Sequence, residues 1–126
     1  MRPSSPLRIV VGDDQAIMRE GIAHILRDAG FDVVATAADA DDLLRKARAH
    51  RPDVVVTDIR LKEGNGIEVV RQVRQASLTS PPKIYVLSNY ASPEYRHECE
   101  LVGADAFFDK SGEYDRFLDT LQRVAH

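Results

Sequence analysis

Polar side chains follow several apolar segments of this sequence, each at the point where the segment ends. In chain order they are Asp13, Asp14, Asp58, Ser88 and Lys110. Carboxylates that lie close together repel one another unless a cation neutralises them, and Mg²⁺ prefers carboxylate oxygens together with water and phosphate. An anionic group arriving at Asp58 would also meet an ammonium and a hydroxyl group. This combination suits phosphoryl transfer, which depends mainly on positioning and charge neutralisation, with Asp58 as the nucleophile.

The segment that ends at Asp58 is expected to organise the fold. Residues 54–56 are three consecutive valines, and a run without polar alternation is typical of a parallel strand covered on both faces. Ligands of such sheets bind just beyond the carboxyl ends of the strands. Taken singly, an acid pair commonly caps a turn or helix, a serine after a strand often belongs to a turn, and a lysine is usually solvated. Because all five side chains are expected at one edge of the sheet, we predict that they form a site.

Hydrophobic periodicity predicts five strands that alternate with five helices. The expected strands cover residues 7–11, 31–37, 53–58, 83–88 and 104–108. The expected helices cover about residues 15–29, 38–50, 67–76, 93–102 and 114–124. We expect Asp14 to be the N-cap of the first helix and Gly30 to stop it. The alternation implies an α/β fold: a doubly wound, five-stranded parallel sheet with helices on both faces.

Composition indicates one domain over residues 7–126, preceded by a short flexible tail at 1–6. The chain is 44% hydrophobic and 29% charged, and its net charge of −3 argues against a basic surface for nucleic acid. No apolar run is long enough to suggest a membrane span, and a cytoplasmic protein is expected. The single cysteine, Cys99, excludes an internal disulfide. Together with Tyr95 and Val102, it is expected to face the core from the fourth helix.

At these polar residues, and from Leu7 to about Val124, the sequence resembles the receiver domain of bacterial two-component response regulators. The resemblance implies a flavodoxin-like three-layer sandwich with strand order 2-1-3-4-5. It also implies that Asp58 accepts a phosphoryl group from a histidine kinase or a small phosphodonor.

The resemblance also implies a set of ligands and a switch. Asp14 would bind Mg²⁺ directly and Asp13 largely through water, with Asp58 and the backbone carbonyl of Arg60 as the other protein ligands. Ser88 and Lys110 would contact the phosphoryl oxygens.

The aromatic residue three positions before the family lysine is Phe107, which would turn inward as Ser88 moves toward the phosphate. The alternative is that Phe107 is a fixed core side chain. The surface of the fourth helix, fifth strand and fifth helix would carry the signal.

The sequence departs from the family pattern in the loops around Asp58. Ser111 stands where the family often has a proline after the lysine, which leaves open whether the preceding peptide is cis. Leu61-Lys62 replaces a common Met-Pro pair, so the loop is expected to be more mobile. Arg60 and Asn89 are bulky, and we predict that they obstruct water and slow dephosphorylation. The alternative is that both side chains point to solvent.

We therefore expect a signalling switch rather than an enzyme. The expected partners are a histidine kinase and an output domain outside this sequence, and the expected output is control of transcription. DNA would be bound only through that output domain. No interaction with a membrane is expected. A homodimer is a candidate state of the phosphorylated form. An aspartyl phosphohydrolase would carry a second Asp where Arg60 stands. The other alternative is a non-phosphorylated interaction module of the same fold, against which the acidic cluster and Lys110 argue.

Overall fold

The computed structural model describes residues 6–76 and 80–125, and within them strands and helices alternate as predicted. The strands are β1 (Arg8–Gly12), β2 (Asp32–Ala37), β3 (Val54–Thr57), β4 (Lys83–Ser88) and β5 (Ala106–Asp109). The helices are α1 (Ala16–Asp28), α2 (Ala40–His50), α3 (Gly66–Gln75), α4 (Pro93–Val102) and α5 (Tyr114–Ala125). All strand pairs are parallel, and the sheet order β2-β1-β3-β4-β5 confirms the expected fold class. Most of the predicted N-terminal tail, residues 1–5, lies outside the described residues.

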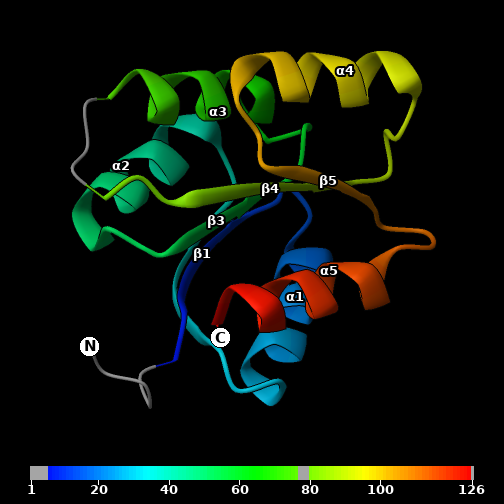
Figure 1. The fold of residues 1–126 in the computed structure, drawn as a ribbon. Coiled ribbons are helices and arrows are strands. Elements are labelled where there is room, and N and C mark those ends of the chain that lie inside the picture. Colours follow the sequence, from blue (N-terminus) through cyan, green and yellow to red (C-terminus); the bar gives the residue numbers. More distant parts are fainter. Residues whose placement is uncertain (1–5, 77–79, 126) are drawn as a thin grey trace.

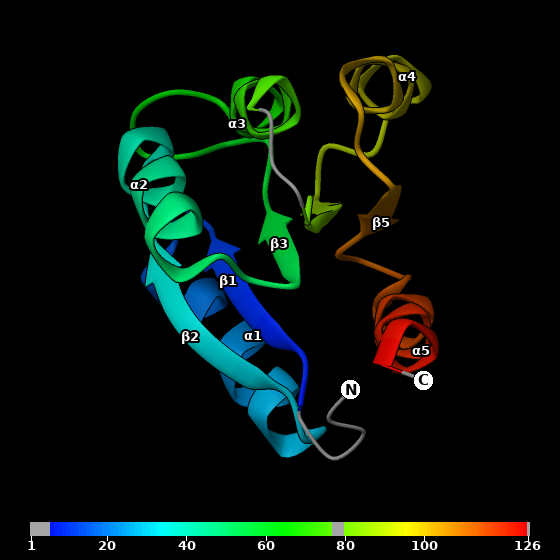
Figure 2. The ribbon, with the colours of Figure 1, turned by 60° about the vertical axis from the view of Figure 1, so that its left-hand side comes forward.

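Helices cover both faces of the sheet. Helices α2, α3 and α4 lie on one face, and α1 and α5 lie on the other (Figures 1 and 2). A strand between two helical layers has no solvated face, which explains why β3 is a continuous valine run with every residue buried. No helix in the described part of the chain has the length and apolarity needed to span a membrane.

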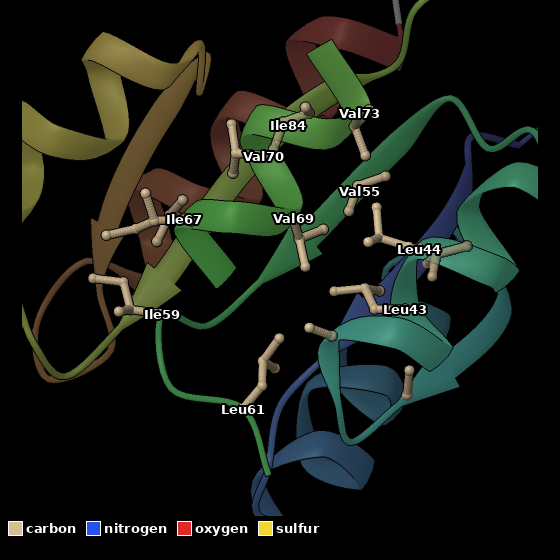
Figure 3. Packing of buried hydrophobic residues seen from close by; sticks show 14 of the residues in the cluster. Leu43, Leu44, Val55, Ile59, Leu61, Ile67, Val69, Val70, Val73 and Ile84 are labelled. Atoms are coloured by element: carbon tan, nitrogen blue, oxygen red, sulfur yellow. The ribbon is translucent and has the colours of Figure 1, made fainter. Parts of the chain in front are cut away.

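Each layer is built from its own apolar cluster. On the α2–α4 face, Val55 and Ile84 of the sheet pack against Leu43 of α2 and Val70 of α3 (Figure 3). Cys99 of α4 belongs to the same cluster. On the other face, residues of β1 and β3 pack against the helices through Ile22, Leu26, Phe117 and Leu121. The two clusters fix the strands from both sides and so fix the edge where they end.

Short polar side chains begin three of the helices. The Asp39 carboxylate accepts the Asp42 N–H at 2.8 Å, so α2 begins at Ala40, two residues later than predicted. The prediction that Asp14 caps α1 is wrong. Helix α1 begins at Ala16, so Gln15 occupies the N-cap position and makes no side-chain cap hydrogen bond, while the Asp14 carboxylate lies in an acidic cluster. Gly30 follows the last turn of α1 with a φ of 93°, which confirms it as the stop signal.

Helix α4 is held to the sheet by little buried surface. Cys99 is the one fully buried residue among its ten, and burial raises the pKa of the Cys99 thiol to about 11. Val102 is half-buried and packs against the core as predicted. The expectation that Tyr95 faces the core is wrong: its side chain is 39% exposed and packs edge-on against Tyr90, with ring centroids 6.3 Å apart.

Arg74 at the end of α3 compensates for this limited burial. Its guanidinium donates to the carbonyl of Gly103 at 2.8 Å and to that of Pro82 at 3.0 Å. It also pairs with Asp105, whose carboxylate accepts the Ile84 N–H at 2.7 Å. One side chain thus joins α3, the start of β4 and the turn between α4 and β5.

We predict that Arg74→Ala lowers the free energy of unfolding by about 2 kcal/mol, because several charge-assisted hydrogen bonds are lost together. Urea denaturation measures this change. Arg71→Ala is the matched control on the same helix: Arg71 forms an ion pair with Glu68 in which the side chains are 45% and 46% exposed, so its loss is expected to cost less than about 0.5 kcal/mol. Equal effects of the two substitutions would contradict this account of Arg74.

Candidate functional site

The five strand-end side chains lie at one edge of the sheet, and an ion-pair cluster joins three of them. The Lys110 ammonium donates to Asp58 Oδ2 at 2.7 Å and also to Asp13 Oδ2. Asp13, Asp58 and Lys110 are each less than 10% exposed, although each carries a titratable side chain. Ser88 is fully buried at the end of β4, and Asp14 is half-buried.

Strand register brings these side chains together. Gly12 of β1 pairs with Thr57 of β3, so Asp13 and Asp58 are the next residue on each strand. The Asp58 N–H donates to the Gly12 carbonyl at 3.0 Å, which extends the ladder to Asp58 itself. The Lys110 N–H donates to the Ser88 carbonyl at 3.0 Å, so β5 carries the lysine past the end of β4.

Two residues that support the cluster were not singled out from the sequence. Gly66, the first residue of α3, lies directly against Asp58: a Cβ at this position would be 1.9 Å from the Asp58 carbonyl oxygen, closer than any side chain allows. Arg19 of α1 donates to the Asp13 carbonyl at 2.8 Å and so fixes the turn that carries the acid pair. The two glycines of the 62–66 loop were a signal for Gly66, but no local pattern indicates the role of Arg19.

The charges of the cluster do not balance. Burial raises the pKa of Asp13, although the hydrogen bond from Lys110 opposes this effect. Burial acts to lower the pKa of Lys110, but the hydrogen bonds to Asp13 and Asp58 act in the opposite direction and together outweigh it. The pKa of Lys110 is therefore raised, and the amine is an ammonium. One ammonium faces three carboxylates, each of which offers an oxygen within 4.8 Å of the other two. Hard oxygen donors with excess negative charge fit a divalent cation such as Mg²⁺.

The expected switch residues lie on the neighbouring strands β4 and β5. Ser88 Oγ accepts the Tyr90 N–H at 3.1 Å, so its hydroxyl already has a partner in the loop that follows β4. Phe107 is half-buried on the α4 face of β5, and the guanidinium carbon of Arg96 lies 4.8 Å from the centroid of its ring. Phe107 therefore lies between the sheet and α4, so a change in its position would alter its contact with Arg96 of that helix.

The structure gives the contacts of the loops around Asp58. The Lys62 N–H donates to the Ala38 carbonyl at 2.8 Å, so the 61–66 loop is bonded to the loop before α2. The peptide between Lys110 and Ser111 is trans. Arg60 and Asn89 are both exposed, but Arg60 is not simply solvated: its guanidinium carbon lies 4.9 Å from the centroid of the Tyr90 ring. The sequence had not indicated a role for Tyr90 in this region. The assignment of the Arg60 carbonyl as a metal ligand stays a prediction.

We predict that Lys110→Met lowers the free energy of unfolding by about 3–5 kcal/mol in buffer with a chelator, because Asp13 and Asp58 would then be buried without a counter-charge. Denaturation in urea measures the change. The double variant Lys110→Met/Asp58→Asn removes one of the uncompensated charges and is expected to be more stable than the single variant. If the double variant is no more stable, the ammonium does not hold this edge together.

Comparisons with known proteins agree with this geometry. Residues 9–122 match the family model described as the response regulator receiver domain. Chemotaxis protein CheY of Bacillus subtilis is 31% identical over 117 residues, which cover 93% of this chain and 96% of that protein. The DNA-binding transcriptional activator DevR/DosR of Mycobacterium tuberculosis is 32% identical over 105 residues, which cover 82% of this chain and 48% of that protein.

Solved structures give the same result. The signal receiver domain of NarL from Mycobacterium tuberculosis is 30% identical with a TM-score of 0.87, over 96% of this chain and 97% of that one.

This chain spans 50% of the length of the transcriptional regulatory protein PdtaR of Mycobacterium tuberculosis. It spans 32% of the length of a protein-glutamate methylesterase/protein-glutamine glutaminase of Haloarcula marismortui.

Proposed function

This chain belongs to the response regulator receiver domain family, and on that premise we propose that Asp58 accepts a phosphoryl group from a histidine kinase and that the surface of α4, β5 and α5 transmits the result. The observation that carries the proposal is the buried ion-pair cluster. Asp58 is a carboxylate at the carboxyl edge of a parallel sheet, held 2.7 Å from an ammonium and beside two further carboxylates. Such an arrangement suits a group that takes up and holds a phosphoryl anion.

In the proposed reaction, an Asp58 carboxylate oxygen attacks the phosphorus atom of a phosphohistidine. The new O–P bond forms an acyl phosphate as the P–N bond breaks, and the electron pair of that bond remains on the imidazole. The Lys110 ammonium, already bonded to Asp58, transfers one of its hydrogen bonds to a phosphoryl oxygen. A Mg²⁺ ion held by Asp13, Asp14, Asp58 and the Arg60 carbonyl would supply the remaining neutralisation of charge.

Phosphorylation would then favour a second arrangement of the domain. The phosphoryl group adds a charge of about −1.5 to −2 and new acceptor oxygens. The Ser88 hydroxyl, whose oxygen accepts the Tyr90 N–H, would move and donate its own hydrogen to a phosphoryl oxygen, and Phe107 would move into the space that Ser88 leaves. Converting an equilibrium from 1:99 to 99:1 requires about 5.5 kcal/mol of preference. Since Phe107 has no hydroxyl group to bond differently in the two states, a smaller preference is expected here.

The output is proposed from similarity alone. The likeness to DevR/DosR supports control of transcription through a DNA-binding domain outside this sequence, and a homodimer is a candidate phosphorylated state. The likeness to CheY, over nearly all of that protein, supports direct control of a partner protein instead. Both outputs would use the same phospho-acceptor.

We predict that incubation with acetyl phosphate and Mg²⁺ adds one phosphoryl group per chain, seen by intact mass spectrometry. Asp58→Asn is expected to abolish the adduct, and Asp14→Asn to reduce its rate of formation at least tenfold, because the cluster then neutralises less of the cation's charge. Asp53→Asn is the matched control, since Asp53 lies just before β3, at the opposite edge of the sheet, and its carboxylate accepts the Arg8 N–H. An adduct that survives Asp58→Asn would contradict the proposal, and the absence of any adduct would support a non-phosphorylated interaction module.

We also predict that Arg60→Ala and Asn89→Ala each shorten the lifetime of the phosphorylated form severalfold, because less bulk then obstructs the attacking water. Loss of the phosphoryl group after removal of the donor, followed by mass spectrometry, gives the lifetime. Because Arg60 stacks on Tyr90, Tyr90→Ala is expected to act in the same direction as Arg60→Ala. Unchanged lifetimes would mean that these side chains point away from the path of water.

A further inference from the structure

Arg96 of α4 connects three parts of the proposed signalling surface. Its Nη2 donates to Glu113 Oε1 at 2.8 Å, and its Nε donates to the Ala91 carbonyl at 3.3 Å. The guanidinium also lies over the ring of Phe107, with its carbon 4.8 Å from the ring centroid. A guanidinium can use its edge for hydrogen bonds and its flat face for an aromatic ring at the same time, which a lysine ammonium cannot do.

Glu113 connects the same contacts to the phosphorylation site. Its Oε1, which binds Arg96, also accepts the N–H of Asp109 at 2.8 Å, and Asp109 directly precedes Lys110. One carboxylate oxygen therefore joins α4 to the end of the strand that carries the lysine. The Glu113 side chain is 19% exposed and that of Arg96 is 38% exposed, so the pair is partly shielded from water.

Glu113 also offers an internal comparison. Its second oxygen, Oε2, accepts from Arg116 at 2.6 Å. Arg116 lies on α5, and its side chain is 73% exposed. The same carboxylate thus binds one arginine on α4 and one on α5, the helix that directly follows Glu113.

The contacts at Asp58 link this connection to the phosphorylation site. Asp58 Oδ2 and Lys110 Nζ are 2.7 Å apart, so a phosphoryl group on Asp58 would add oxygen acceptors beside the ammonium and change its hydrogen bonds. The main chain of Lys110 is bonded to Ser88 on one side, and the preceding residue is bonded to Glu113 on the other. Movement at this point changes the position of the carboxylate that holds Arg96.

We propose that Arg96 and Glu113 form a latch that holds α4 against Phe107 in the unphosphorylated domain and opens when Asp58 is phosphorylated. The proposal rests on the proposed phosphorylation of Asp58. The latch is the element with two arrangements: closed, with the guanidinium over the ring, and open, with Phe107 free to turn. Because coupling between two sites is reciprocal, a latch that opposes the phosphorylated arrangement must also oppose phosphorylation.

The test labels the four phenylalanines with fluorine and follows the Phe107 resonance by ¹⁹F NMR, assigned with Phe107→Leu. Acetyl phosphate and Mg²⁺ phosphorylate the sample, and intact mass gives the rate. In the wild type, the Phe107 resonance is expected to move on phosphorylation. In Arg96→Ala it is expected to move less than half as far, because the domain already populates the open arrangement, and phosphorylation is expected to be severalfold faster. Arg96→Lys, which keeps the charge and loses the flat face, is expected to resemble Arg96→Ala.

Arg116→Ala is the matched control, because it removes the other arginine partner of Glu113 without changing a residue of α4, and it is expected to behave as the wild type. If Arg96→Ala and Arg116→Ala give the same resonance change and the same rate, the latch is refuted while phosphorylation of Asp58 stands. If the wild type takes up no phosphoryl group, both the proposed function and the latch are overturned. Thermal unfolding of each variant establishes that it is folded.

Discussion

The ammonium of Lys110, buried between the carboxylates of Asp13 and Asp58, is the interaction on which the edge of the sheet depends. Charged groups removed from water are costly unless they are paired, and breaking a buried pair costs more than it would at the surface. β1, β3 and β5 each contribute one member, so the pairing also fixes where three strands end. The remaining negative charge of the carboxylates favours binding of a cation at this edge, and a bound cation would in turn favour binding of an anionic group.

The sheet beneath this edge is a rigid platform, while the surface that would carry the signal is attached more loosely. Asp13 is fixed by a backbone bond to Ala37 and by Arg19, and Asp58 lies against Gly66, where no side chain fits. By contrast, α4 buries Cys99 alone completely, packs Val102 partly against the core, and is otherwise held by polar contacts of Arg96 and of the turn that follows it. Polar contacts can be exchanged for others at little cost, whereas packed apolar contacts cannot. The proposed response of α4 to a change at Asp58 relies on this difference in attachment.

Much of the fold could be predicted from local sequence, because each element has a strong pattern of its own. The valine run of β3 and the apolar stripes of the helices define the alternation, and a parallel sheet necessarily gathers the carboxyl ends of its strands. Element ends were less predictable. Asp14 could equally cap a helix or join an acidic cluster, and only the neighbouring carboxylates decided between them. Tyr95 has the spacing of a core residue, but α4 presents only a narrow stripe to the sheet, and the ring packs on Tyr90 instead.

The sequence by itself determined which side chains meet at the edge of the sheet, since strand order and chain direction bring Asp13, Asp58 and Lys110 to the same place. Only the tertiary structure decided how that edge is connected to the rest of the surface. Arg96 and Glu113 are 17 residues apart on different elements, and Arg74 and Gly103 are 29 apart. Such pairs leave no periodic signal, because their partners are chosen by the packing of separate helices and loops rather than by the pattern within either one.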